Sequence, residues 1–160
     1  MTGIKLLRAK YRTLSFAFIV FLWIVTVYSS VIRIHPFESA YYNEFVGGID
    51  GASRLGLETE YWGNSYFEIL PWMNSHKNEM MCVWPTTHPF YYYQAMGTLE
   101  SGVVFNASQN SCKYGIVLMR QGLFGKNTYI DEMVKNQKPI YTVSVGKTVL
   151  VGVYEVKSKK

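Results

Sequence analysis

The feature that most limits the fold of this chain is an uncharged apolar run near its N-terminus, TLSFAFIVFLWIVTVYSSVI, at residues 13–32. About 20 helical residues at about 1.5 Å each extend about 30 Å, which is the thickness of a bilayer core. The alternative is a cleaved signal peptide, because a basic segment precedes the run, but the apolar region of a signal peptide has only about 7–15 residues. We therefore predict one uncleaved transmembrane helix.

Basic residues are distributed unevenly around this run. Lys5, Arg8, Lys10 and Arg12 precede it, whereas Arg33 alone follows it closely. Because cytoplasmic flanks carry the excess of Lys and Arg, we expect a single-pass protein of the cell membrane. Its N-terminus would be cytoplasmic and its C-terminal domain extracytoplasmic.

The formal net charge of +5 is a property of the two ends of the chain. Four of the 16 basic residues precede the apolar run and three form the C-terminal tail, so the 11 acidic residues outnumber the basic ones that remain. A nucleic-acid-binding face needs clustered Lys and Arg to neutralise phosphates. We therefore expect no nucleic-acid partner.

The remainder of the chain alternates between strand-like and helix-like segments. MMCVWP, GVVFN and YGIVLMR favour short buried strands, whereas HPFYYYQAMGTLE and NTYIDEMVKNQ favour helices, the second with Asn127 as its cap. PIYTVSVGKTVLVGVYEV alternates with a period of two and breaks at Gly146-Lys147, which predicts an antiparallel hairpin. This order predicts a small α/β domain with a mixed sheet.

Four segments follow from these patterns: a cytoplasmic basic segment (1–12), the transmembrane helix (13–34), an interfacial motif segment (35–64) and the extracytoplasmic α/β domain (65–160). Within the third, FESAYYNEF predicts a short interfacial helix with aromatic anchors, which Gly47-Gly48 would end. SYFEILPWMNS at 65–75 has mostly helical spacing, with Ser65 and Glu68 placed as in a capping box.

Cys82 and Cys112 both fall on the predicted outer side of the membrane, where disulfides persist. The sequence leaves two alternatives open: a disulfide that closes a loop of about 30 residues, or two buried free thiols. Asn106-Ala107-Ser108 is an N-x-S sequon, so Asn106 is a candidate glycosylation site.

Acidic pairs are the main candidates for chemistry in the sequence itself. On a strand, Glu58 and Glu60 would point the same way and could share a cation or a sugar hydroxyl; the alternative is a solvated loop. The three histidines lack the spacing of metal ligands, and neither a phosphate-binding loop nor a G-x-S-x-G or H-E-x-x-H motif is present. We expect no catalytic residue, metal site or cofactor in this chain.

Two motifs follow the apolar run: HPFESAYYNEFVGG at 35–48 and GASRLGLETEYWGNSYFEILPWMN at 51–74. With the preceding helix and the α/β domain that follows, they resemble the C-terminal region of GT-C-type membrane glycosyltransferases, in the protein mannosyltransferase-like branch. The pattern there is His-Pro-aromatic, Tyr-aromatic-Asn-Glu, Gly-Gly, then Asp-Tyr-Trp-Gly. Here Glu60 replaces the aspartate, and recognisable residues extend from Leu14 to Asn74.

The resemblance implies a function and a set of site residues. Such enzymes transfer a sugar from a polyprenyl-phosphate carrier to an acceptor at the membrane surface, and this chain would be their C-terminal portion or subunit. The residues expected to bind substrate are Tyr42, Asn43, Glu44, Glu60, Tyr61 and Trp62. The family's catalytic acid lies in a first outer loop that this chain lacks, so we expect no activity by the chain alone, and a divalent cation only in a full enzyme.

The partners implied are membrane lipid, a polytopic membrane protein and a lipid-linked sugar. An alternative function belongs to a different class: a single-pass, non-catalytic subunit of a larger membrane complex, whose outer domain serves for docking. Small residues in the span, such as Ser15, Ala17 and Ser29, permit close helix packing and suit both alternatives.

Overall fold

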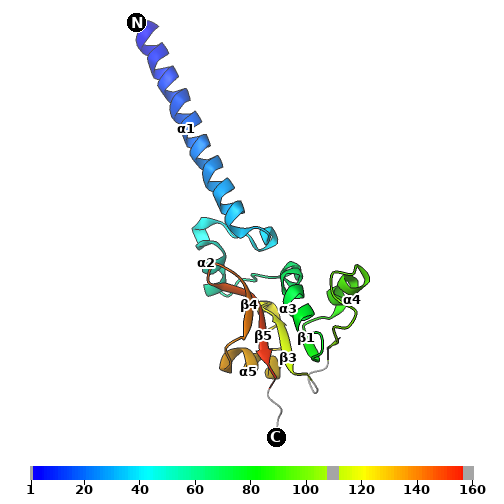
Figure 1. The fold of residues 1–160 in the computed structure, drawn as a ribbon. Helices are drawn as coiled ribbons and strands as arrows, with labels where there is room; N and C mark the ends of the chain where they lie inside the picture. The colour runs from blue at the N-terminus through cyan, green and yellow to red at the C-terminus, as the bar shows by residue number, and fades with distance from the viewer. Residues whose placement is uncertain (1, 108–111, 157–160) are drawn as a thin grey trace. The chain divides into compact units, whose positions relative to one another are not determined.

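The computed structural model describes residues 2–107 and 112–156, with side chains from Tyr11 onward (Figure 1). The chain forms two compact units, residues 1–38 and 39–160. The first unit is dominated by α1 (Thr2–Ile34), which contains a stretch, Tyr11–Ile34, that is long and apolar enough to cross a membrane. The helix ends just before His35-Pro36, because proline disfavours the α conformation in the residue before it.

The second unit is built on a five-stranded mixed sheet with the order β2-β1-β3-β5-β4. Its strands are β1 (Met81–Trp84), β2 (Phe105–Asn106), β3 (Tyr114–Leu118), β4 (Tyr141–Val145) and β5 (Thr148–Glu155). β1 is parallel to β2 and β3, whereas β5 is antiparallel to β3 and β4. The predicted mixed α/β class and the terminal hairpin are therefore confirmed, although only the last two residues of the predicted strand GVVFN form β2.

Helix α5 (Thr128–Asn136) covers one face of the sheet (Figure 1). Asn127 caps it as predicted, because its side-chain oxygen accepts a hydrogen bond from the amide of Ile130 at 3.2 Å. The buried residues that form this layer are Val117, Met119, Ile130, Met133 and Tyr154. Gly115 lies under the Met133 side chain, so odd-numbered residues of β3 face α5.

The opposite face of β3 carries Tyr114, whose ring meets Trp72 edge-on at 5.1 Å. Trp72 belongs to α3 (Leu70–Ser75), which follows a 3-10 helix, η3 (Asn64–Ile69). Helix α4 (His88–Ala95) adjoins this layer through Phe90, whose ring centroid lies 4.8 Å from that of Tyr66 in η3. Helical segments therefore cover both faces of the sheet.

The start of η3 differs from the predicted capping box. Gly63 is the N-cap residue, with φ at +76°, and the hydroxyl of Ser65 has no hydrogen-bond partner among the described residues. The buried amides of Gly63 and Ser65 instead donate to the carboxylate of Glu60, a residue that precedes the helix. The capping-box prediction for Ser65 and Glu68 is therefore wrong.

Residues 38–54 form three short helical segments rather than one helix ended by glycines. They are η1 (Glu38–Ala40), η2 (Glu44–Val46) and α2 (Gly48–Arg54). Gly47, with φ at +84°, is both the C-cap of η2 and the N-cap of α2, so the glycines end one helical segment, as predicted, and also begin the next. A side chain at Gly51 would overlap the carbonyl oxygen of Val46, which shows how closely α2 packs on η2.

Helix α2 is also tied to the hairpin of β4 and β5. The Asp50 carboxylate accepts hydrogen bonds from the Thr148 hydroxyl at 2.7 Å and from the Lys147 amide at 2.9 Å. The Thr148 hydroxyl, followed by the Lys147 amide, lowers the pKa of Asp50 below its ordinary value. Residues 39–64 of the motif segment therefore belong to the second unit.

Candidate functional site

The two sequence motifs, although separated along the chain, are joined by hydrogen bonds. The Tyr42 hydroxyl donates to the carbonyl oxygen of Glu58 at 2.6 Å. The Asn64 side-chain amide donates to the Ser39 hydroxyl at 3.0 Å. The first motif therefore lies directly beside the second, and residues 39–46 and 58–64 form one surface, which we call the motif surface.

The second motif is fixed to the loop that leaves β3. Arg120 Nε donates to Glu58 Oε1 at 2.9 Å. Gln121 forms a reciprocal pair with Thr59: its side-chain oxygen accepts from the Thr59 amide at 3.1 Å, and its side-chain amide donates to the Thr59 hydroxyl at 2.9 Å. Three hydrogen bonds thus hold Glu58 and Thr59 at the end of β3.

The same motif also reaches the end of β1. The Tyr66 hydroxyl donates to the carbonyl oxygen of Trp84, the last residue of β1, at 2.8 Å. Because β1 and β3 are parallel, their carboxyl ends meet at one edge of the sheet. In open α/β sheets, ligands bind outside the carboxyl ends of the strands. The motif surface therefore adjoins the edge of the sheet at which α/β domains bind ligands.

Arg120, Tyr61 and Glu58 form the charged centre of this edge. The Arg120 guanidinium lies over the Tyr61 ring, 4.0 Å from its centroid, while its Nε is held by Glu58. The hydrogen bond to Glu58 raises the pKa of Arg120 further above its ordinary value, so the guanidinium stays charged. Its side chain is about one quarter exposed, and a charged planar donor is thereby presented at the rim.

Glu60 is buried, with 2% of its surface exposed. Its two carboxylate oxygens accept hydrogen bonds from the amides of Gly63, at 2.7 Å, and Ser65, at 3.3 Å. Burial, followed by the charge of Glu60, raises the pKa of the nearby Tyr66 well above its ordinary value. Glu60 thus shapes the turn that leads into η3.

The hypothesis that Glu58 and Glu60 share a ligand from one strand is not supported by this geometry. Residues 57–63 form no strand, and the two carboxylates have separate partners: Arg120 for Glu58, and backbone amides for Glu60. The pair lies neither on a shared strand face nor on a solvated loop. Each glutamate organises a different part of the motif surface.

The other predicted site residues divide into structural and exposed ones. Asn43 is the N-cap of η2, and its side-chain oxygen accepts from the Val46 amide at 3.4 Å. Glu44 begins η2 and is exposed. Tyr61 is 52% exposed and Trp62 is 73% exposed, with their rings edge-on at 4.9 Å. Substrate contact by all six residues stays a prediction, and Tyr61 and Trp62 are the aromatic ones whose rings are accessible.

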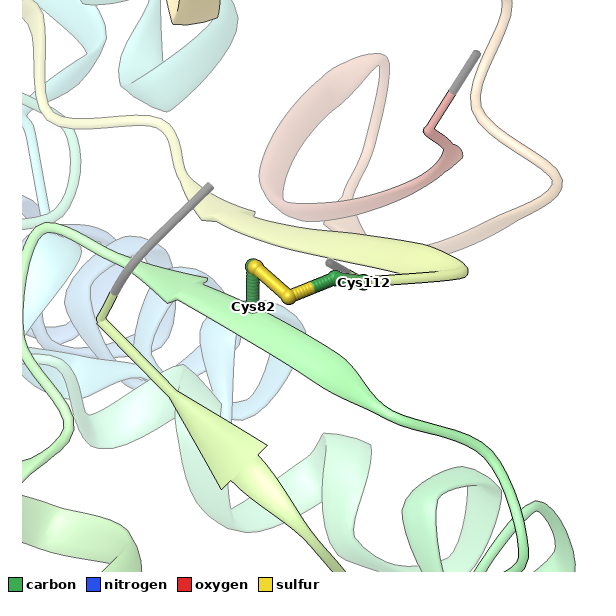
Figure 2. Close-up of a disulfide and its surroundings, with 2 residues drawn as sticks. All are labelled: Cys82 and Cys112. Atoms are coloured by element: carbon green, nitrogen blue, oxygen red, sulfur yellow. A yellow bond between two sulfur atoms is a disulfide. The ribbon is translucent and has the colours of Figure 1, made fainter. Parts of the chain in front are cut away.

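Cys82 and Cys112 form a disulfide, with their Cα atoms 5.6 Å apart (Figure 2). Cys82 lies in β1, and Cys112 lies two residues before β3. Of the two alternatives that the sequence left open, the structure contains the disulfide. Asn106 of the sequon lies in β2 and is exposed, whereas Ser108 lies outside the described residues.

Among the described residues, no group of three or more His, Cys, Asp or Glu side chains is placed to hold a metal ion. A hollow of about 210 Å³ lies elsewhere, lined by Phe124, Gly125, Asp131, Val134 and Lys135. None of the predicted site residues lines it. This hollow is therefore separate from the motif surface.

Arg120 and Gln121 are the two residues of the site that sequence reasoning missed. Both follow YGIVL, the clearest buried strand, so their place at a sheet edge could have been inferred. Their pairing with Glu58 and Thr59 joins positions 62 residues apart, which no local pattern encodes.

Comparison of the chain with protein-family models, with curated proteins and with solved structures gives no match.

Proposed function

We propose that the chain is a single-pass protein of the cell membrane, anchored by Tyr11–Ile34, with its N-terminus cytoplasmic and its α/β domain outside. The length and apolar character of that stretch support the anchor. The excess of Lys and Arg before it supports the orientation. The disulfide is consistent with an extracytoplasmic domain, because disulfides persist in oxidising compartments.

We further propose that this domain is the C-terminal portion or subunit of a membrane glycosyltransferase that uses a polyprenyl-phosphate-linked sugar. The observation that carries the proposal is the convergence of the two motifs at the carboxyl edge of β1 and β3, beside Arg120. An arginine suits a phosphate group because its planar donors match phosphate oxygens. Tyr61 and Trp62 offer flat aromatic faces with polar atoms, which suit a sugar ring.

In this proposal the chain positions substrate and does not supply the catalytic acid. Glu58 orients the guanidinium of Arg120, and Glu60 holds the turn that presents Tyr61 and Trp62. The catalytic acid, the carrier cavity and any divalent cation belong to a polytopic partner, as the resemblance implies. The motif surface helps to close that cavity over the donor or the acceptor.

The second candidate is a non-catalytic subunit of another membrane complex, with the outer domain used for docking. It is favoured by the positions of Asn43 and Glu60, because both side chains are engaged in local backbone hydrogen bonds. On this view the motifs are scaffold, and the exposed aromatic side chains contact protein.

The deciding experiment is purification of the full chain in mild detergent, followed by mass spectrometry of the proteins that accompany it. Recovery of a polytopic glycosyltransferase-like protein supports the first candidate and permits a transfer assay with a lipid-linked sugar. Recovery of a membrane complex without a glycosyltransferase supports the second.

Site variants then test the role of the motif surface in that assay. Arg120→Ala and Trp62→Ala should lower transfer by the reconstituted complex, whereas two exposed controls should not: Lys138→Ala, before β4, and Tyr92→Ala, on α4. Unchanged transfer in both site variants would refute the substrate-positioning role.

A further inference from the structure

The motif surface exposes several large aromatic side chains. Phe45 is 100% exposed, Trp62 is 73% exposed and Tyr61 is 52% exposed. Scattered single apolar residues need no explanation, but several large ones on two stretches that hydrogen bonds hold together indicate a contact surface.

These exposed residues belong to a single rigid part of the domain. Phe45 lies in η2, against which α2 packs so closely that Gly51 has no room for a side chain. The hydrogen bond from Tyr42 to Glu58 joins this part to the stretch that carries Trp62. Phe45 and Trp62 are therefore held by the same framework.

The covalent chain restricts what can cover this surface. Ser39 follows the last residue of the apolar helix, Ile34, by five residues, which reach at most about 18 Å when fully extended. The hydrogen bond from Asn64 to Ser39 places the second motif beside Ser39. Trp62, two residues before Asn64, therefore lies near Ser39 although it is 23 positions further along the chain. Both motifs are thus tethered within a short distance of the end of the apolar helix, whatever the orientation of the domain.

Lipid is the occupant that fits this tether and this chemistry. The headgroup region favours Trp and Tyr, whose rings are apolar and whose N–H or O–H groups remain hydrated. Trp62 and Tyr61 have these properties, and Phe45 adds a purely apolar side chain that is fully exposed.

We propose that Phe45 and Trp62 insert into the boundary between headgroups and acyl chains of the outer leaflet, so that the motif surface lies on the membrane. This inference rests on the proposed membrane anchor, but not on the glycosyltransferase proposal. Lipid contact would hold the charged edge at Arg120 at the depth where a lipid-linked substrate carries its phosphate.

The test uses the full chain in nanodiscs of phosphatidylcholine, with a nitroxide label at Phe45→Cys or, separately, at Trp62→Cys. Both native cysteines are in the disulfide, so a single new cysteine is labelled without reductant. The matched control is Met96→Cys, which is 63% exposed just after α4 and outside the tethered motifs. Collision rates with oxygen and with a water-soluble nickel chelate are measured for each label.

We expect the ratio of oxygen to nickel collisions to be several-fold higher at positions 45 and 62 than at position 96, with both labels within about 10 Å of the acyl boundary. Equal ratios at all three positions in the disc-embedded chain would overturn lipid docking. Protection of positions 45 and 62 only after a polytopic partner is added would also overturn it, in favour of a protein contact.

The failure of the anchor itself is recognised separately. Extraction of the full chain from membranes by alkali would overturn the anchor and, with it, the lipid contact. Because Phe45 has no buried surface, its substitution removes no internal packing, and the labelled protein should show an unchanged near-UV circular dichroism spectrum.

Discussion

Replacement of Glu60 by alanine tests whether the most buried acidic residue of the motif acts as scaffold. The change removes the acceptor for the buried amides of Gly63 and Ser65. A buried group left without its hydrogen bond costs about 1–3 kcal/mol, so the two together predict a loss of about 2–6 kcal/mol in the free energy of unfolding. Glu60→Gln should lie between, because its amide offers one acceptor oxygen instead of two.

The measurement is guanidinium chloride unfolding of the full chain in mild detergent, followed by tryptophan fluorescence. The control is Glu68→Ala, an exposed glutamate in η3, which should change the free energy of unfolding by less than about 0.5 kcal/mol. If Glu60→Ala were as stable as Glu68→Ala but sugar transfer were lost, Glu60 would contact substrate and the structural reasoning would be refuted.

Three further predictions concern stability. Gly51→Ala should destabilise the domain by about 1–3 kcal/mol, because the overlap with the Val46 carbonyl outweighs a gain of about 1 kcal/mol in helix propensity; chemical denaturation checks this against Gly102→Ala, where the added side chain would make only an ordinary contact with Lys77 at 3.9 Å. The Thr148 hydroxyl lowers the pKa of Asp50, so this carboxylate contributes stability above its ordinary pKa that is lost as the pH falls, and Asp50→Asn should flatten the acid side of a melting-temperature profile. Reduction of the disulfide, whose cysteines are 30 positions apart, should cost about 3–4 kcal/mol, measured by unfolding with and without reductant.

The regular elements of this fold could be predicted because their information is local. The alternation of β4 and β5 around Gly146-Lys147 marks a hairpin, and Asn127 marks the start of α5; both occur as expected. The apolar run that ends before Pro36 likewise defines one long helix.

The motif segment could not be predicted in the same way. Its elements are only three to seven residues long, so they are too short for hydrophobic periodicity to identify them. Gly47 and Gly63 also take positive φ values at the starts of α2 and η3, although Gly47 ends η2 as well. The cap of η3 comes from Glu60, outside the helix, a solution that the usual capping patterns do not include.

Only some residues of the candidate site could be named from the sequence. Tyr61 and Trp62 were named from their motif, and both are exposed in the structure, while their contact with substrate stays a prediction. Arg120 was missed because its hydrogen bond to Glu58 depends on the strand order. The pairing of β3 with β1 places the end of β3 beside the second motif. Non-local pairings of this kind become visible only after the strand order is known.

The disulfide between Cys82 and Cys112 closes a loop of the domain covalently. It links β1 to the segment entering β3, and these two strands are neighbours in the sheet, so α4 and β2 lie on a covalently closed loop (Figure 2). A single peptide-bond cleavage within that loop would leave both fragments attached to each other. Residues could also be inserted there without changing the register of β1 against β3, because the disulfide and the strand ladder fix both ends. The loop is thus the natural position in this domain for an inserted epitope or binding peptide.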